Sequence, residues 1–120
     1  MAISDLLQRI DDYAAMIRAY RPLSEAEVRE LDAYYRIGIT YSSNALEGNS
    51  LTLSETKVLL EDGITVGGKP IRDCYEATGH ARAYDYMLTL ARSGSLSITE
   101  DVIRHLHCLF YNGIDPETAG

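Results

Sequence analysis

The sequence predicts an all-α fold of about five helices. Apolar residues recur at the three-to-four-residue spacing of amphipathic helices. Three segments also open with a capping box, in which a Ser or Thr precedes a Glu by three residues. The strands that a βαβ unit would require are absent from the pattern. At 120 residues, the chain has about the length of one domain.

The first two helices are predicted from their apolar stripes and their boundaries. Residues 4–20 form an amphipathic segment, and Pro22 marks its end. Ser24 and Glu27 form a capping box, so a second helix is predicted from there to about Glu47. The residues predicted to point inward from these helices are Leu6, Ile10, Tyr13, Ala14 and Ile17, then Val28, Leu31, Tyr35, Tyr41 and Ala45.

The next two helices flank a loop. Thr52 and Glu55 form a second capping box, which predicts a short helix ending near Gly63. Residues 63–70 contain three glycines and a proline, which is typical of a loop. A helix is then predicted over residues 71–92, with Gly94 ending the region. Its predicted inward stripe consists of Tyr75, Gly79, Ala83, Tyr86 and Leu90.

The last helix is predicted to begin at a third capping box, Ser97-Ile98-Thr99-Glu100, and to run to about Asn112, before Gly113. Some apolar residues of the last two helices should face a partner surface. We expect the chain to self-associate, or to pack these helices against a neighbour in a crystal, since large apolar patches are normally covered. The residues involved should be drawn from Tyr86, Leu90, Leu106 and Phe110.

Composition and charge exclude several classes of protein. The formal net charge of −7 and the pI of about 4.8 disfavour a nucleic-acid partner, which would require clustered Lys and Arg. Cys74 and Cys108 form no CxxC pair, and buried free thiols are favoured over a metal site. The start of the chain has no signal-peptide pattern, and no apolar run has the length of a membrane span. We therefore expect a cytoplasmic protein without membrane contact.

The stretch from Ser43 to Gly48 combines features that suggest a functional site. Ser43 and Glu47 are four residues apart and share one helix face. Glu47 falls at a helix end, where a carboxylate opposes the helix dipole, and Gly48 is placed for a left-handed cap. However, Glu61 and Asp62 precede Gly63 in the same way. On spacing alone, a helix end with surface polar residues is the favoured interpretation.

At these residues the chain resembles the Fic-domain proteins. Ser43-xxx-Glu47-Gly48 matches the inhibitory motif [S/T]xxxE[G/N] of that family. Residues 47–56 resemble the run EGN-x-LTL-x-ET that follows the motif, and residues 115–120 resemble DP-x-x-AG. The Glu, Ala and His that the family usually has between these runs correspond to Glu76, Ala83 and His107. The resemblance covers roughly residues 35–120, and several runs in the right order make it specific.

The chain departs from the family pattern in one respect. Fic enzymes carry the motif HxFx[D/E]GNGRxxR, and the 120 residues contain no such segment. His80, His105 and His107 lack the glycine-rich loop that holds phosphate. We therefore expect the N-terminal part of a longer Fic protein, truncated before its flap. Residues 1–48 would form the N-terminal helices, including the inhibitory helix, and residues 49–120 the incomplete beginning of a Fic-like helical bundle.

The resemblance implies an activity and a regulatory role. Fic enzymes transfer AMP from ATP, with a metal ion such as Mg²⁺, to a Ser, Thr or Tyr hydroxyl of a target protein. The inhibitory Glu, here Glu47, pairs with the second arginine of the catalytic motif, which then cannot hold the γ-phosphate. Ser43 would fix that Glu or touch the nucleotide site. The fragment alone should be inactive, with neither ATP nor metal tightly bound.

The resemblance leaves an alternative open. A free-standing helical interaction protein, such as an antitoxin that supplies an inhibitory helix in trans, would carry the same motif. The stretch after Glu47 continues into residues typical of the enzyme core, which favours the adenylyltransferase part. Its expected partners are the C-terminal Fic half and the substrate protein. The sequence does not identify the target, and it does not show whether the parent adds or removes AMP.

Overall fold

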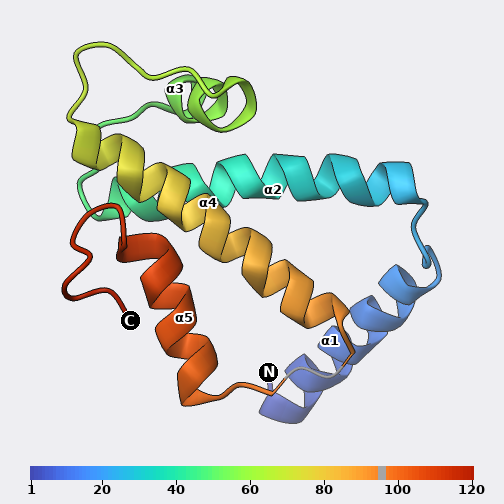
Figure 1. Ribbon diagram of the computed structural model, residues 1–120. Coiled ribbons are helices and arrows are strands. Elements are labelled where there is room, and N and C mark those ends of the chain that lie inside the picture. Colours follow the sequence, from blue (N-terminus) through green and yellow to red (C-terminus); the bar gives the residue numbers. More distant parts are fainter. Residues whose placement is uncertain (95–96) are drawn as a thin grey trace. The chain divides into compact units, whose positions relative to one another are not determined.

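The computed structural model describes residues 1–94 and 97–120, and this part of the chain is helical without a strand (Figure 1). The elements are α1 (Ile3–Arg18), α2 (Glu25–Leu46), α3 (Leu53–Lys57), the π-helical turn η1 (Val58–Asp62), α4 (Ile71–Arg92) and α5 (Glu100–Tyr111). The predicted all-α fold class is therefore confirmed. None of these helices has an apolar stretch long enough to cross a membrane.

Two of the predicted capping boxes form as expected. The Ser24 hydroxyl accepts a hydrogen bond from the Glu27 amide, and the Glu27 carboxylate accepts one from the Ser24 amide. Thr52 and Glu55 make the same reciprocal pair at the start of α3. These bonds satisfy amides that have no partner within the first helical turn.

The start of α5 differs from the prediction by two residues. Its N-cap is Thr99, whose hydroxyl accepts a hydrogen bond from the Val102 amide, and not Ser97. Both residues have a capping oxygen, so the choice depends on where the helical backbone begins. Starting at Glu100 places Glu100 and Asp101 in the first turn, where acidic side chains favour the helix dipole.

The chain divides into two compact units, Met1–Asp32 and Ala33–Gly120. Unit 1 contains α1, and none of the residues of that helix is buried. The predicted division after residue 48 concerns function, and it stays a prediction.

Unit 2 has a small core at the start of α4. The buried apolar residues Leu51, Leu59, Cys74 and Ala77 form one cluster, and Val66 packs against it. On its other side α4 packs against α5, where Gly79 lies so close to the Phe110 backbone that a Cβ would be 2.3 Å from the carbonyl oxygen. A glycine is required at this crossing of the two helices.

The buried faces of α2 and α4 differ from those predicted. In unit 2 the buried residues of α2 are Thr40 and Asn44, whereas Tyr35 and Ala45 are exposed. In α4, Gly79 is buried as predicted, but Tyr75 is 43% exposed. The other buried residues of α4 are Cys74, Ala77 and Ala81. The reason is that α4 contacts η1 on one side and α5 on another, so its buried surface follows no single stripe.

Candidate functional site

The three predicted site residues lie at the C-terminal end of α2. Ser43 is half-buried in the last turn, and Glu47 and Gly48 are exposed directly after the helix, which ends at Leu46. Glu47 is thus the capping residue rather than part of the final helical turn. Within the described residues, its carboxylate forms no hydrogen bond or ion pair, so it is free to contact a group supplied from elsewhere.

The turn after α2 is a complete Schellman motif. The Asn49 amide donates to the Asn44 carbonyl over 3.0 Å, and the Gly48 amide donates to the Ala45 carbonyl over 3.1 Å. Gly48 has a φ of 91°, which confirms the predicted left-handed conformation. The Glu47 amide also donates to the Asn44 carbonyl over 3.1 Å. These bonds fix the backbone on both sides of the Glu47 side chain.

Asn49 ties this turn to α4. Its Nδ2 donates to the Asp73 carbonyl oxygen and to Glu76 Oε2, each over 3.0 Å. Its Oδ1 accepts a hydrogen bond from the Leu51 amide over 3.0 Å. The anchoring role was not predicted, because the partners lie more than twenty residues further along the chain.

Ser50 and Lys69 reinforce the same anchor. The Ser50 amide donates to Asp73 Oδ2 over 2.8 Å, and the Ser50 hydroxyl donates to the same oxygen. These bonds stabilise the carboxylate and hold the pKa of Asp73 below its ordinary value. Lys69 Nζ donates to the Ser50 carbonyl over 2.8 Å and lies 3.5 Å from Glu55 Oε1. The turn is therefore bound to both the start of α4 and the preceding loop.

Glu76 is the acceptor at the centre of this arrangement. One of its oxygens accepts from Asn49, and the other accepts from Arg72 Nε over 3.0 Å. Its side chain is only 16% exposed. These two donors satisfy the largely enclosed carboxylate, so Glu76 serves as a structural hub between the turn and α4.

Beneath the turn, polar residues of α2 face α4. Thr40 is fully buried, and its Oγ1 lies 3.2 Å from His80 Nδ1. Burial lowers the pKa of His80 and favours its neutral form. Further along the helices, Arg36 and Asp85 form a bidentate ion pair with distances of 2.8 and 3.0 Å. These contacts set the position of the second half of α2 on α4.

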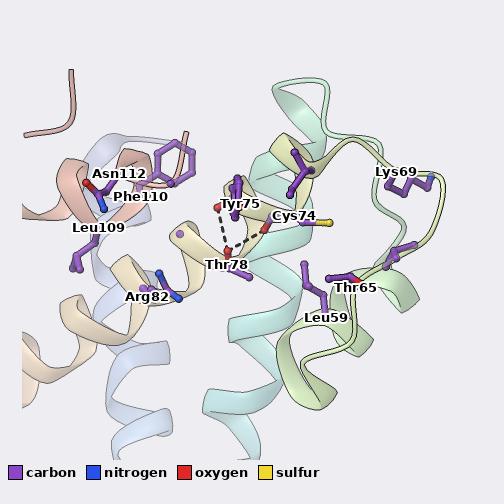
Figure 2. A pocket seen from close by; sticks show the side chains of 14 residues that line it. Leu59, Thr65, Lys69, Cys74, Tyr75, Thr78, Arg82, Leu109, Phe110 and Asn112 are labelled. Atoms are coloured by element: carbon purple, nitrogen blue, oxygen red, sulfur yellow. Dashed lines mark hydrogen bonds between the residues drawn. The ribbon is translucent and has the colours of Figure 1, made fainter. Parts of the chain in front are cut away.

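Figure 2 shows a separate pocket, with a volume of about 570 Å³, that lies against α4, the end of α5 and the loop before α4. Its lining includes Lys69, Cys74, Tyr75, Arg82 and Phe110. None of the three predicted site residues lines it. The candidate site is therefore the exposed turn at Glu47 and not this hollow.

The chemistry that this arrangement offers is that of one exposed carboxylate. In residues 1–94 and 97–120, no group of three or more His, Cys, Asp or Glu could hold a metal ion. What the fold provides is the exposed Glu47 carboxylate at a turn whose backbone is hydrogen-bonded on both sides. Such a group can pair with a cation, above all with a guanidinium, which binds a carboxylate through two parallel hydrogen bonds.

Comparisons of the sequence identify relatives, although no family model matches it. Over 80 residues, the chain is 38% identical to "Protein adenylyltransferase Fic" from Nematostella vectensis, covering 67% of this chain and 19% of the relative. Over 115 residues it is 31% identical to "Protein adenylyltransferase Fic" from Drosophila persimilis, covering 95% of this chain and 22% of the relative. The chain thus spans about a fifth of the length of these relatives.

The fold has a crystallographic counterpart. The structure of a Fic domain containing signaling protein from Bacteroides thetaiotaomicron superposes with a TM-score of 0.78 at 28% sequence identity. The superposition covers 84% of this chain and 38% of that one. Together with the sequence relatives, this confirms the resemblance predicted from the motifs between Ser43 and Gly120.

Proposed function

The chain belongs to the Fic family, and on that premise we propose that it is the N-terminal, autoinhibitory part of a Fic protein adenylyltransferase. The parent would transfer AMP from ATP to Ser, Thr or Tyr hydroxyls of a target protein. Its catalytic motif would lie outside this segment, which has about a fifth of the length of the relatives. The antitoxin alternative is not favoured, because the aligned relatives are adenylyltransferases.

One observation carries the proposal: the exposed Glu47 carboxylate stands on a turn whose backbone is fixed on both sides. Here the Schellman motif and the Asn49 contacts with Asp73 and Glu76 restrict where Glu47 can point. Preorganisation of this kind favours binding to one defined partner group.

The proposed partner of Glu47 is an arginine of the catalytic part. During transfer, the target hydroxyl loses its proton and its oxygen bonds to the α-phosphorus, while the bond to pyrophosphate breaks. An arginine that Glu47 holds through two hydrogen bonds cannot hold the γ-phosphate in the same geometry. The nucleotide is then misaligned for in-line attack, and transfer is suppressed.

The remaining site residues have supporting roles in this proposal. Ser43, one turn before Glu47 and half-buried, would contact the Glu47 side chain or the nucleotide. Gly48 allows the left-handed turn that directs Glu47 outward. ATP and Mg²⁺ would bind to the catalytic part, and we assign no metal contact to residues of this segment. The other partners would be the C-terminal Fic half, the substrate protein and, as a further expectation, a second copy of the chain.

The test compares two glutamates in the full-length protein that carries this segment. Glu47→Gly should increase labelling with radioactive α-phosphate ATP, because it removes the competing carboxylate. Glu61→Gly is the matched control, since Glu61 is also exposed and also lies near a glycine in a left-handed conformation, Gly63. Labelling that rises equally in both variants, or in neither, would exclude the inhibitory role of Glu47.

A further inference from the structure

The last turn of α2 lies between two anchors on α4. On its N-terminal side, the fully buried Thr40 pairs with His80 over 3.2 Å. On its C-terminal side, Asn49 donates to Glu76 over 3.0 Å. Both anchors join α2 or its turn to α4. Residues 41–48 are therefore the segment that can move while both anchors stay intact.

Asn44 lies between the two anchors, and its side-chain amide lacks the hydrogen bond that each anchor has. Its side chain is 6% exposed, and its Nδ2 has no hydrogen-bond partner among the described residues. Thr40, Asn44 and Glu47 are spaced by four and three residues, so they share one face of the helix. The residue that carries the unpaired donor therefore lies one turn before Glu47 on the same face.

A buried donor without a partner opposes the closed arrangement. In water the amide of Asn44 would be fully hydrogen-bonded, so opening of this turn regains bonds that the closed state lacks. The expected penalty on the closed state is on the order of tenfold in the opening equilibrium. The two anchors carry no such penalty, because their donors are paired.

We propose that the last turn of α2 opens more readily than the rest of the helix, because the unpaired amide of Asn44 destabilises its closed state. The Thr40–His80 and Asn49–Glu76 contacts hold the two ends of this turn on α4. The turn opens by local unwinding of residues 43–48, and the rest of α2 stays docked on α4. The regulatory consequence rests on the proposed function: each opening would move Glu47 away from its arginine, so Asn44 would set how often inhibition is relieved.

Hydrogen exchange on the 120-residue chain tests the opening without any activity assay. The probes are the amides of Glu47, Gly48 and Asn49, which are all bonded to carbonyls of the last turn. In the wild-type chain they should exchange faster than the amide of the buried Ala81 in α4. In Asn44→Leu, which has nearly the same shape but no unpaired donor, their exchange should slow on the order of tenfold.

Asn49 provides the matched control. It is the same residue type at the same turn, but its Nδ2 has two partners. Asn49→Leu should therefore accelerate exchange of the Glu47 and Gly48 amides, the opposite of the result expected for Asn44→Leu. Amides of α5 that exchange by local opening should be unchanged in the Asn44 variant, because Asn44 stays in its closed position when only α5 opens.

The inference is overturned if Asn44→Leu leaves exchange of these amides unchanged or makes it faster. If the Leu variant does not fold, Asn44→Met decides in the same way, because methionine adapts to irregular space. Failure of both to fold also overturns it, since the inference requires that the amide be dispensable. These outcomes are independent of the Glu47→Gly labelling result, so either proposal can fail without the other.

Discussion

Asn49 Nδ2 donates a hydrogen bond to Glu76 Oε2 over 3.0 Å, and this contact joins the turn that carries Glu47 to the first half of α4. The two residues are separated by 27 positions in the sequence. The bond is only partly exposed to water, and Arg72 holds the other oxygen of the same carboxylate. The position of the proposed inhibitory residue therefore depends on a helix that does not itself contain it.

Removal of this contact should destabilise the chain. Asn49→Ala removes three hydrogen bonds and leaves the Glu76 carboxylate with one donor fewer, so we expect a loss of about 2 kcal/mol in the free energy of unfolding. Urea unfolding followed by circular dichroism measures it. Asn112→Ala is the matched control, because Asn112 is exposed, and its effect should stay within about 0.5 kcal/mol. Equal losses in the two variants would contradict the anchoring role.

The crossing of α4 and α5 should not tolerate a methyl group at Gly79. A Cβ there would lie 2.3 Å from the Phe110 carbonyl oxygen, so Gly79→Ala should force the helices apart at a cost of about 1–3 kcal/mol. In contrast, Gly38 lies within α2 with no atom within 4 Å of a built Cβ. Gly38→Ala should therefore stabilise the chain by up to about 1 kcal/mol. Thermal unfolding of both variants tests the difference in sign.

Stability should depend on the ionisation of Asp73. The hydroxyl and amide of Ser50 keep the pKa of Asp73 below its ordinary value, so the folded state favours the carboxylate. This stabilisation is complete above the pKa that Asp73 has in the unfolded chain, about 4, and it is lost as the pH falls through the pKa of Asp73 in the folded state.

We therefore expect the free energy of unfolding to decrease below about pH 4, and Ser50→Ala to weaken that dependence. Unfolding in urea across the acid range provides the measurement, with Ser54→Ala as an exposed control on α3. A Ser50 variant with the same pH dependence as the wild type would show that this pair does not contribute.

The 120-residue chain on its own should not transfer AMP. Its sequence contains no HxFx[D/E]GNGR motif, so incubation with labelled ATP and a mixture of candidate proteins should leave no label above background. The adenylyltransferase from Nematostella vectensis is a suitable positive control. Labelling of the chain itself, or of an added protein, would mean that other residues perform the chemistry.

Much of the secondary structure could be predicted from local signals. The predicted helix over residues 71–92 was correct, because Pro70 and Gly94 mark its two ends. The left-handed conformation of Gly48 could be predicted because this glycine directly follows the end of a helix. The prediction of Ser97 as the N-cap of α5 was wrong, because a second residue that can cap a helix, Thr99, lies two positions later. Local pattern could not decide between them.

The contacts that hold the site in place could not be predicted from the local sequence pattern. The apolar periodicity predicted an apolar buried face on α2, whereas the residues buried in this helix are the polar Thr40 and Asn44. For Thr40, α4 supplies a hydrogen-bonding partner, His80, forty positions away in the sequence. Similarly, the Asn49 contacts with α4 depend on tertiary packing. The motif identified Glu47, and the contacts of Asn49 with α4 account for the position of the turn that carries it.

The most direct test of the central claim is the initial rate of AMP transfer by the full-length protein with Glu47→Gln. This change keeps the shape of the side chain and removes the charge that would hold an arginine through two strong hydrogen bonds. We expect a rate at least about tenfold above that of the wild type, since each charged hydrogen bond contributes about 1.5–3 kcal/mol. A rate equal to or below that of the wild type would contradict it.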